Sequence, residues 1–568
     1  MPAPIFTVEA VTASAVLLAS AWPLTRAGKA IVADCRTHGR WLSLALGGVA
    51  LTALALRFFA VTPTLLSHEP SVHHYLDRLL HPLGPEAAWH PFHGMGGYVL
   101  HAGITRVFGD SLGVIWTTNR LFDALTPLLC YLLARRLFDS PLAGVLAAAL
   151  LAVFPPQLRV AASTQLLSLT VFFAAAAYCA VLDALERPGR WSYLAAAVAL
   201  AAAMQLRAEV ATHLFFCGLL ILMRVRGEAW PRLDRWFFGA CGLLVVLCIL
   251  RLLSSLQTTE NPEGLFRLRF FLETLLSRRH LYINPELVSP VYPLLTLLGL
   301  VGLAMQRRWR LLLFLAIALA AGWVFYLNQF TFDVYEALRF QAHAWFLLIA
   351  VAGFGLSWLA TISRQTALRV GICALGLAAA TGSLITAWPL LTQHTATAQN
   401  VTFFASHLHR VPTACELYLL RPRHKGKKRP YGPGIHPRWA LKSRAGKTRS
   451  FPEQLQTGPQ PGCRVAYLGV GCASRYPSDD PAFVDKVRQD YKRRVGPPLY
   501  VHVERWRAGL DRQPPPPRPE CQWLRRHFQL EPLVTTTIHP GRRTYIWTPK
   551  KKLTVGFYRL RARPTKPR

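Results

Sequence analysis

The residues best suited to chemistry lie in one stretch, SHEPSVHHYLDRLLHPLGPEAAWHPFHGMGGYVLHAGITRVFGDS, which follows the first strongly apolar segment. It spans residues 67–111 and contains seven histidines and four carboxylates, Glu69, Asp77, Glu86 and Asp110. A carboxylate beside apolar helices at a membrane surface loses part of its hydration, which raises its pKa. Such a group suits a general base that activates a hydroxyl or amine nucleophile. The alternative is that these are ordinary solvated loop residues.

The histidines of this stretch also suggest a metal site, but their spacing does not support one. His68-Glu69 is followed by a histidine at 73 rather than at 72, where the H-E-x-x-H pattern needs it on one face of a helix, and Pro70 interrupts a helix. We therefore expect no required metal and no cofactor. A looser set of metal ligands remains as the alternative: His73, His74, His90 and His93.

The elements that must position this stretch are apolar segments of about twenty residues, which recur along residues 1–392. Hydrophobic residues make up 52% of the 568-residue chain and charged residues only 16%, against roughly 25% charged in a soluble domain. This composition excludes one large soluble enzyme, a disordered chain and a collagen-like or coiled-coil protein. We predict a polytopic helical membrane protein with about 11–12 transmembrane helices. The predicted spans are 4–22, 41–58, 112–134, 142–156, 162–183, 191–206, 210–223, 236–256, 290–305, 311–328, 342–361 and 370–392.

Alternate loops between these spans are short and basic, and such loops remain cytoplasmic. The two long loops, 59–111 and 257–289, are then expected to face outward. The basic residues that set this orientation are Arg26, Lys29, Arg36, Arg40, Arg135, Arg136, Arg187, Arg190, Arg224, Arg226, Arg232, Arg235, Arg307, Arg308, Arg310, Arg364 and Arg369.

Residues 393–568 have a different composition and are predicted to form a second domain outside the membrane. They hold 35 of the 64 basic residues and 10 of the 29 acidic ones, a net charge of +25, and no segment that could span a bilayer. Because long domains are translocated largely regardless of charge, this basic domain is expected to face outward as well. The sequence predicts a small α/β domain. Its expected elements are a strand at 465–471, an amphipathic helix at 480–495 and paired strands at 544–549 and 555–561.

Four of the eleven cysteines lie in this second domain, Cys415, Cys463, Cys472 and Cys521. In an exported domain they could form two disulfides, in any of three pairings, and the alternative is four unpaired thiols. The Ala/Arg/Leu/Pro-rich composition indicates a GC-rich bacterial genome. The expected location is the bacterial cytoplasmic membrane, with the C-terminal domain on the periplasmic or extracellular side.

Several motifs follow one another in an order that resembles the GT-C superfamily of membrane glycosyltransferases. They are HP-F-x-G-x-x-G-Y in the first long loop, VFGDSLGVIWTTNRL, YLLARRLFDSPLAGVLAAALLAVFPP, LRAEVATHLFF (206–216), LRFQAHAWFLLIA (338–350) and the closing VGFYRL. The most similar branch contains the protein O-mannosyltransferases, the aminoarabinose transferase of lipid A and the RgtA/B/C/D-like enzymes. The resemblance covers residues 41–392 well and the C-terminal domain loosely.

This resemblance implies inverting transfer of a sugar from a polyprenyl-phosphate carrier to an envelope acceptor on the outer face of the membrane. The family's first outward loop usually begins with Asp or Asp-Glu, which makes Glu69 the expected base here, with His68 or Asp77 assisting. Arg207 and Arg339 match family positions and would hold the donor phosphate. Arg159 is a third arginine at an expected outer helix end, and the alternative for all three is that they reach toward lipid headgroups. The expected substrate-binding set is Arg207, Arg339, Arg159, Gln165 (at a position that is often acidic in the family), His90 and His93.

Two other classes of protein remain as alternatives: a transporter or flippase for lipid-linked sugars, and a non-catalytic envelope assembly protein. A transporter would favour paired charges near the bilayer midplane and two related halves, and the sequence has no such internal repeat. The G-M-G-G at 94–97 follows no strand, so no nucleotide-binding loop is predicted. An outward orientation excludes nucleic acid as the partner of the basic domain. Membrane lipids or phosphorylated envelope glycans are the partners that fit its charge.

Overall fold

The computed structural model divides into two compact units, a helical unit that ends at Thr392 and a C-terminal unit that includes the elements from α20 onward. The structure describes residues 3–62, 95–109, 112–163, 166–207, 210–225, 235–256, 289–327, 344–392, 396–420, 448–451, 454–455, 462–472, 480–493, 499–512, 518–539 and 552–563.

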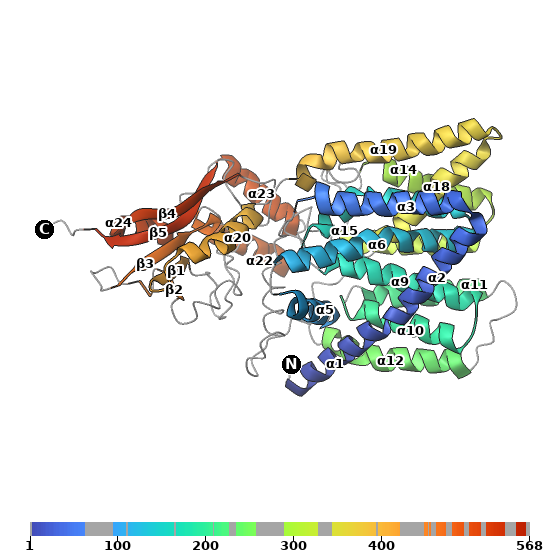
Figure 1. Ribbon diagram of the computed structural model, residues 1–568, viewed down its shortest axis with the longest axis horizontal. Helices are drawn as coiled ribbons and strands as arrows, with labels where there is room; N and C mark the ends of the chain where they lie inside the picture. The colour runs from blue at the N-terminus through green and yellow to red at the C-terminus, as the bar shows by residue number, and fades with distance from the viewer. Residues whose placement is uncertain are drawn as a thin grey trace. The chain divides into compact units, whose positions relative to one another are not determined.

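The helical unit consists of helices that lie side by side in Figure 1. In chain order they are α1 (Ala3–Ala19), α2 (Ala21–His38), α3 (Arg40–Ala55) with a π-helical turn (Leu56–Ala60), α5 (Met95–Phe108), α6 (Leu112–Phe138), α7 (Pro141–Ala152), α8 (Pro155–Ala161), α9 (Leu167–Glu186), α10 (Arg190–Met204), α11 (Ala211–Val225), α12 (Arg235–Leu256), α14 (Val291–Met305), α15 (Trp309–Leu327), α18 (Trp345–Ile362) and α19 (Thr366–Thr392). Each predicted span coincides with a helix over most of its length.

Some of these helices are long and apolar enough to cross a membrane. In the described part of the chain, four helices are long and apolar enough to cross a membrane, or five if the bent pair α7 and α8 forms one span. The four are Arg40–Ala60, Leu167–Glu186, Trp345–Ile362 and Thr366–Pro389, and five further apolar helices are shorter.

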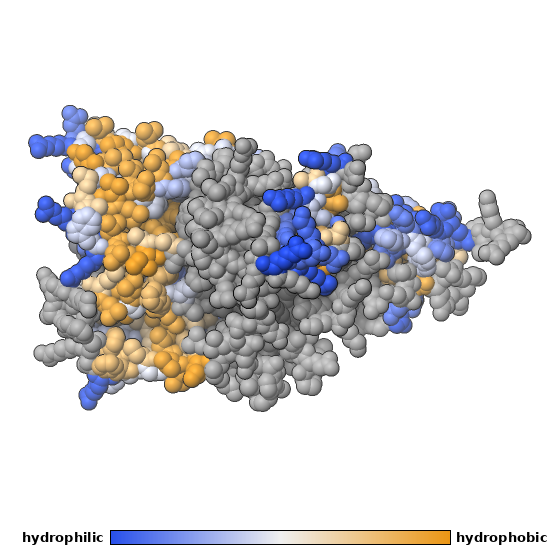
Figure 2. Space-filling view, turned by 180° about the vertical axis from the view of Figure 1, so that it is seen from behind, coloured by the Kyte–Doolittle hydropathy of each residue, from blue (hydrophilic) through white to orange (hydrophobic). Residues whose placement is uncertain are grey.

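Apolar side chains cover the outer surface of the helical unit. Leu44, Leu51, Val246, Leu375 and Ile385 are 67–78% exposed. Figure 2 shows this surface in orange, with hydrophilic residues in blue along one side of the unit. An exposed apolar surface of this extent is stable only when something apolar covers it, and lipid does so for a membrane protein. The predicted fold class, a helical membrane protein with a small C-terminal α/β domain, is confirmed.

The short basic loops meet at one end of the helical unit. Arg135 Nε lies 3.2 Å from Asp34 Oδ2, and Arg308 Nη2 lies 3.4 Å from Asp139 Oδ2. Arg26 and Arg136 both bind Asp183, at 2.6 and 3.1 Å. Residues from four parts of the sequence, in or beside the predicted basic loops, thus share one end of the unit, as the alternation of these loops predicts.

The C-terminal unit is a five-stranded mixed sheet with helices on both faces. The strand order is β2-β1-β3-β5-β4, with β1 parallel to β2 and β3, and β5 antiparallel to β3 and β4. The elements are α20 (Ala396–His407), β1 (Glu416–Leu420), β2 (Thr448–Phe451), β3 (Arg464–Leu468), α22 (Pro481–Lys492), α23 (Leu499–Arg512), α24 (Pro519–His527), β4 (Phe528–Ile538) and β5 (Leu553–Ala562).

Each face of this sheet has its own apolar core, because alternate strand residues point to opposite sides. Leu417, Val465 and Phe557 pack with Phe403 and Phe404 of α20 on one face. The other face holds Tyr418, Leu420, Ala466, Leu468 and Leu560, which pack with Leu524 of α24.

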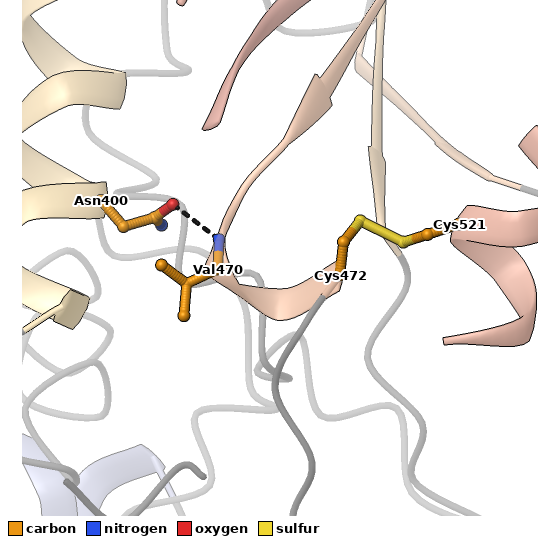
Figure 3. Close-up of a disulfide and its surroundings, with 4 residues drawn as sticks. All are labelled: Asn400, Val470, Cys472 and Cys521. Atoms are coloured by element: carbon orange, nitrogen blue, oxygen red, sulfur yellow. Dashed lines mark hydrogen bonds between the residues drawn. A yellow bond between two sulfur atoms is a disulfide. The ribbon is translucent and has the colours of Figure 1, made fainter. Parts of the chain in front are cut away.

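Two disulfides and one buried amide fasten the ends of these strands. Cys415 is bonded to Cys463 and Cys472 to Cys521, which resolves the three pairings that the sequence left open. Asn400 Oδ1 on α20 accepts hydrogen bonds from Val470 N (3.0 Å) and from the Tyr467 hydroxyl (2.9 Å). Figure 3 shows that the turn after β3 is thereby held on one side by Asn400 and on the other by the Cys472–Cys521 disulfide.

Two of the predicted elements of this unit are confirmed and one pairing is wrong. The helix within 480–495 forms α22, and the strand predicted at 465–471 is β3, which ends at Leu468 before a 3-10 turn. The strand at 555–561 belongs to β5, but its partners in the sheet are β3 and β4 rather than the predicted 544–549. Residues 544–549 lie outside the described part of the chain.

Candidate functional site

Two of the residues predicted to act in the site, Arg159 and Arg207, lie in the described part of the helical unit. The predicted base Glu69 and its neighbours His68 and Asp77 lie outside the described residues. So do the other predicted substrate-binding residues: His90, His93, Gln165 and Arg339.

Arg159 and Arg207 lie at the end of the helical unit opposite the basic loops. Arg159 is on α8, which follows α7, and α7 begins just after the basic end of α6. Arg207 follows α10, which begins at Arg190. Both side chains are buried, with 9% and 3% exposed, and α8 and α10 both pack against α9. Buried guanidinium groups at such positions can hold a phosphate by paired hydrogen bonds and stabilise the negative charge that develops on it as a leaving group.

A second buried polar group lies beside α8 and was not predicted. Arg57, in the π-helical turn that follows α3, donates from Nε to Asp123 Oδ2 at 2.8 Å, and both side chains are completely buried. Gln157 of α8 donates to the other oxygen of Asp123. This cluster joins α3, α6 and α8 within the apolar part of the unit.

Helix α5 carries a third buried polar group. His101 Nε2 lies 3.0 Å from Asn119 Oδ1, and Asn119 Nδ2 donates to the Ser163 carbonyl just after α8. Burial lowers the pKa of His101 to about 4, although the hydrogen bond with Asn119 opposes this shift. His101 is therefore neutral at physiological pH and links α5 to the segment that follows α8.

Two glycines of the GMGG motif, Gly96 and Gly97, allow close packing. Gly96 N donates to the Gln205 carbonyl at 2.8 Å, and a Cβ added at Gly96 would lie 2.9 Å from the Gln205 Cβ. A Cβ at Gly97 would lie 2.5 Å from a Leu166 methyl group. These two glycines let α5 approach the residues that follow α10 and precede α9.

Sequence reasoning missed Arg57, Asp123 and His101 for different reasons. Arg57 and Asp123 are charged residues inside predicted spans, and this is itself a signal of function or pairing. His101 was one of seven histidines in the first long loop, and nothing in the sequence distinguishes it from the others. Among the described residues no group of His, Cys, Asp or Glu side chains could hold a metal ion.

Comparison with known sequences bears directly on this part of the chain. Residues 90–254, which run from α5 into α12 and contain Arg159 and Arg207, match the family described as dolichyl-phosphate-mannose-protein mannosyltransferase. The predicted resemblance to GT-C glycosyltransferases is confirmed. The match covers 165 of the 568 residues. No curated protein matches the chain in sequence.

Comparison with solved structures finds further matches at low sequence identity. The archaeal oligosaccharyltransferase AglB from Archaeoglobus fulgidus, in complex with an inhibitory peptide and a dolichol-phosphate, is 13% identical, with a TM-score of 0.48, over 79% of this chain and 68% of its own. ArnT from Cupriavidus metallidurans bound to undecaprenyl phosphate is 13% identical, with a TM-score of 0.47, over 75% and 93%. The arabinofuranosyltransferase AftD from Mycobacteria is 17% identical, with a TM-score of 0.42, over 71% and 31%. At TM-scores below 0.5 these likenesses do not identify an activity for the GT-C-like chain.

Proposed function

We propose that this chain is a membrane glycosyltransferase that moves a sugar from a polyprenyl-phosphate carrier to an envelope acceptor on the outer face of the cytoplasmic membrane. The observation that carries the proposal is the family match over residues 90–254, because this segment contains two buried arginines at the end of the helices opposite the basic loops. A lipid-linked donor reaches such a site through the bilayer, so the chain needs no nucleotide-binding loop.

In the proposed reaction the acceptor hydroxyl or amine attacks the anomeric carbon of the sugar as the bond to the carrier phosphate breaks. Glu69, with His68 or Asp77 assisting, takes the proton of the acceptor. The carrier leaves as a polyprenyl phosphate, whose added negative charge Arg207 and Arg339 stabilise, with Arg159 as a third cation. The remaining residues of the proposed donor and acceptor site are Gln165, His90 and His93.

The cysteines support an outward C-terminal unit. All four cysteines of that unit are paired in disulfides, and all seven of the helical unit are free thiols. Disulfides persist in oxidising compartments such as the bacterial periplasm. We propose that the chain lies in a bacterial cytoplasmic membrane with its basic loops inside and its C-terminal unit outside, where membrane lipids and the acceptor meet it.

The test is sugar transfer by the purified protein in lipid, from a panel of labelled polyprenyl-phosphate sugars to an envelope extract of a strain that lacks the protein. The parent is compared with Glu69→Gln, with Arg207→Gln and with Arg310→Gln, a control in a basic loop at the opposite end. We expect transfer by the parent and by the control. Glu69→Gln should lose at least 100-fold, on the order of the contribution of a general base.

The alternative outcomes discriminate between the classes of protein. Transfer that survives in Glu69→Gln moves the base to Asp77 or His68. A folded parent that transfers no sugar from any donor contradicts the proposal. In that case a flippase assay with the same lipids tests the transporter alternative, for which the charged pair Arg57–Asp123 inside the helical unit is the observation in favour.

A further inference from the structure

The two prolines at the break between α7 and α8 remove the helical donors of two backbone carbonyls, and that of Leu151 accepts from Phe154 N instead. In the sequence AVFPP, Pro155 and Pro156 follow Phe154, and a residue that precedes proline is driven into the extended conformation that Phe154 adopts (φ −71°, ψ 113°). Helix α7 therefore ends at Ala152, and α8 continues in a direction 57° away. The carbonyl of Ala152 would accept from the N–H of residue 156 in a continuous helix, but Pro156 has none.

Arg57 supplies the missing donor. Its Nη1 donates to the Ala152 carbonyl at 2.9 Å and lies 3.3 Å from the Ala53 carbonyl, while its Nε binds Asp123. Asp123 in turn accepts from Gln157, which lies in the first turns of α8. One guanidinium group thus caps the end of α7, and the carboxylate that it binds holds the start of α8.

Burying these polar and charged groups costs free energy, which indicates that the cluster has a role other than stabilising the fold. A completely buried ion pair is often no more stabilising than apolar residues of the same volume. Arg57 Nη2 and Gln157 Oε1 are also buried without a hydrogen-bond partner among the described residues, and such unsatisfied groups are rare in proteins. The Arg26–Asp183 pair at the opposite end is different, because it is partly exposed (29% and 11%) and its further hydrogen bonds join Arg136 of α6 and Ser192 of α10.

We propose that Arg57, Asp123 and Gln157 form a bracket that fixes the direction of α8 after the proline break and so positions Arg159 toward the donor phosphate. Gln157 and Arg159 lie two residues apart on the same short helix, so a shift of α8 that breaks the Gln157–Asp123 contact also moves Arg159. The role of Arg159 at the donor phosphate rests on the proposed function. The part of the inference in which the three residues fix the direction of α8 does not depend on that function. Arg57, Asp123 and Gln157 act as positioning residues.

The decisive variant is Gln157→Met, which has nearly the same volume and leaves the Arg57–Asp123 pair in place. We expect its KM for the polyprenyl-phosphate sugar to rise about tenfold, with kcat and the KM for the acceptor within about twofold of the parent, since about tenfold corresponds to the loss of one well-placed hydrogen bond. In an Arg159→Gln background the same substitution should change the donor KM by less than about twofold, because the bracket acts through Arg159.

The matched control is Ser192→Ala, which also removes one hydrogen-bond partner of an ion pair, here the 2.8 Å bond from Arg26 Nη2 at the opposite end. It should leave the donor KM unchanged. A purely structural role of Gln157 would lower the amount of active protein in Gln157→Met without raising its donor KM.

Hydrogen exchange of residues 155–163 gives a readout that does not depend on activity. Gln157→Met should raise exchange in α8 and leave α10 unchanged. Faster exchange together with a parent that transfers no sugar would uphold the bracket and reject the proposed function. An unchanged exchange rate in α8, or an equal rise in donor KM in the Arg159→Gln background, would overturn the bracket itself.

Discussion

The helical unit and the C-terminal unit solve the same problem, how to hold irregular segments in place, by different means. In the helical unit, charged and amide side chains do so from inside: Arg57 and Asp123 lie at the break between α7 and α8, and His101 with Asn119 joins α5 to the residue after α8. In the C-terminal unit covalent bonds do so, through Cys415–Cys463 and Cys472–Cys521 at the ends of β1 and β3.

The difference follows from how much surface each unit buries. A small sheet of short strands has two thin cores and gains from cross-links. The helical unit has a large apolar interior. There, leaving a backbone carbonyl or a charge without a partner costs much free energy, so a hydrogen bond or ion pair holds the groups that it joins firmly in place. Removing the buried polar contacts or reducing the disulfides should therefore lower the stability of one unit and leave that of the other unchanged.

Reducing the two disulfides should produce the largest effect, and in the C-terminal unit alone. Their sequence separations are 48 and 49 residues, for which the loss of loop-closure constraint is about 4 kcal/mol each. Hydrogen exchange of the intact protein with and without a reducing agent checks this. We expect the protection of β3 and α24 to fall and that of α6 and α9 to stay constant. Unchanged protection of β3 would show that the apolar cores alone hold the sheet.

Removing one charge of the buried pair should destabilise the helical unit alone. Asp123→Ala leaves Arg57 buried without its counter-charge, which should cost about 3–5 kcal/mol. Thermal unfolding in detergent measures the loss. Asp139→Asn is the control, because Asn tolerates the positive φ (55°) of this position, Asp139 is 69% exposed, and its pair with Arg308 should contribute roughly 0–1 kcal/mol. The double variant Arg57→Leu, Asp123→Leu should lose less than Asp123→Ala, and a larger loss would contradict this account.

Acid should weaken the helical unit through His101. Its pKa is lowered to about 4 in the folded protein, so the unfolded chain binds the extra proton first as the pH falls. The stabilisation is complete above the ordinary pKa of 6.5 and is lost between 6.5 and 4, by about 3 kcal/mol in total. Unfolding measured at several pH values should show this slope. The slope should be smaller in His101→Gln, and an equal slope in both proteins would assign it to other groups.

The smallest of these effects concerns helix packing. A Cβ at Gly355 of α18 would collide with the Leu295 carbonyl and with Gly299 of α14. Gly355→Ala should therefore cost about 1–3 kcal/mol. Gly371→Ala on α19 meets nothing within 4 Å and should be neutral or slightly stabilising. Equal stability of the two variants would mean that α14 and α18 separate easily.

Hydropathy predicted the helices because a bilayer demands a minimum length of apolar chain, which a single sequence records. Hydropathy alone carried the predicted span at 142–156 past Ala152, although Pro155 and Pro156 are a local signal for the break. What the sequence does not show is which group binds the freed Ala152 carbonyl, because that donor is Arg57, almost a hundred residues earlier. Arg57 and Asp123 were visible as charges within apolar spans, but their pairing across 66 residues was not.

Several elements of the C-terminal unit were not predicted: α20, β1, β2, α23, α24 and β4. The longest of these strands is β4, whose sequence FQLEPLVTTTI contains Pro532. A proline argues against a strand unless the strand lies at an edge or carries a bulge. Both conditions hold here, because β4 is an edge strand of the sheet and its register shifts between Pro532 and Val534.

The residues predicted for catalysis, Glu69, His68 and Asp77, lie outside the described part of the chain, and their roles remain predictions.

The place of β5 in the sheet has a consequence for how the protein is made. It is the last described element along the chain, yet it pairs on both sides, with β3 and with β4. Until it has been synthesised, the facing edges of β3 and β4 are open templates for wrong pairing. The Cys472–Cys521 bond joins the turn after β3 to α24, which leads directly into β4. If that bond forms first, it keeps the open edges of β3 and β4 close together. Strand β5 then pairs between two strands that the disulfide already holds near each other, so oxidation before β5 is added should favour correct pairing.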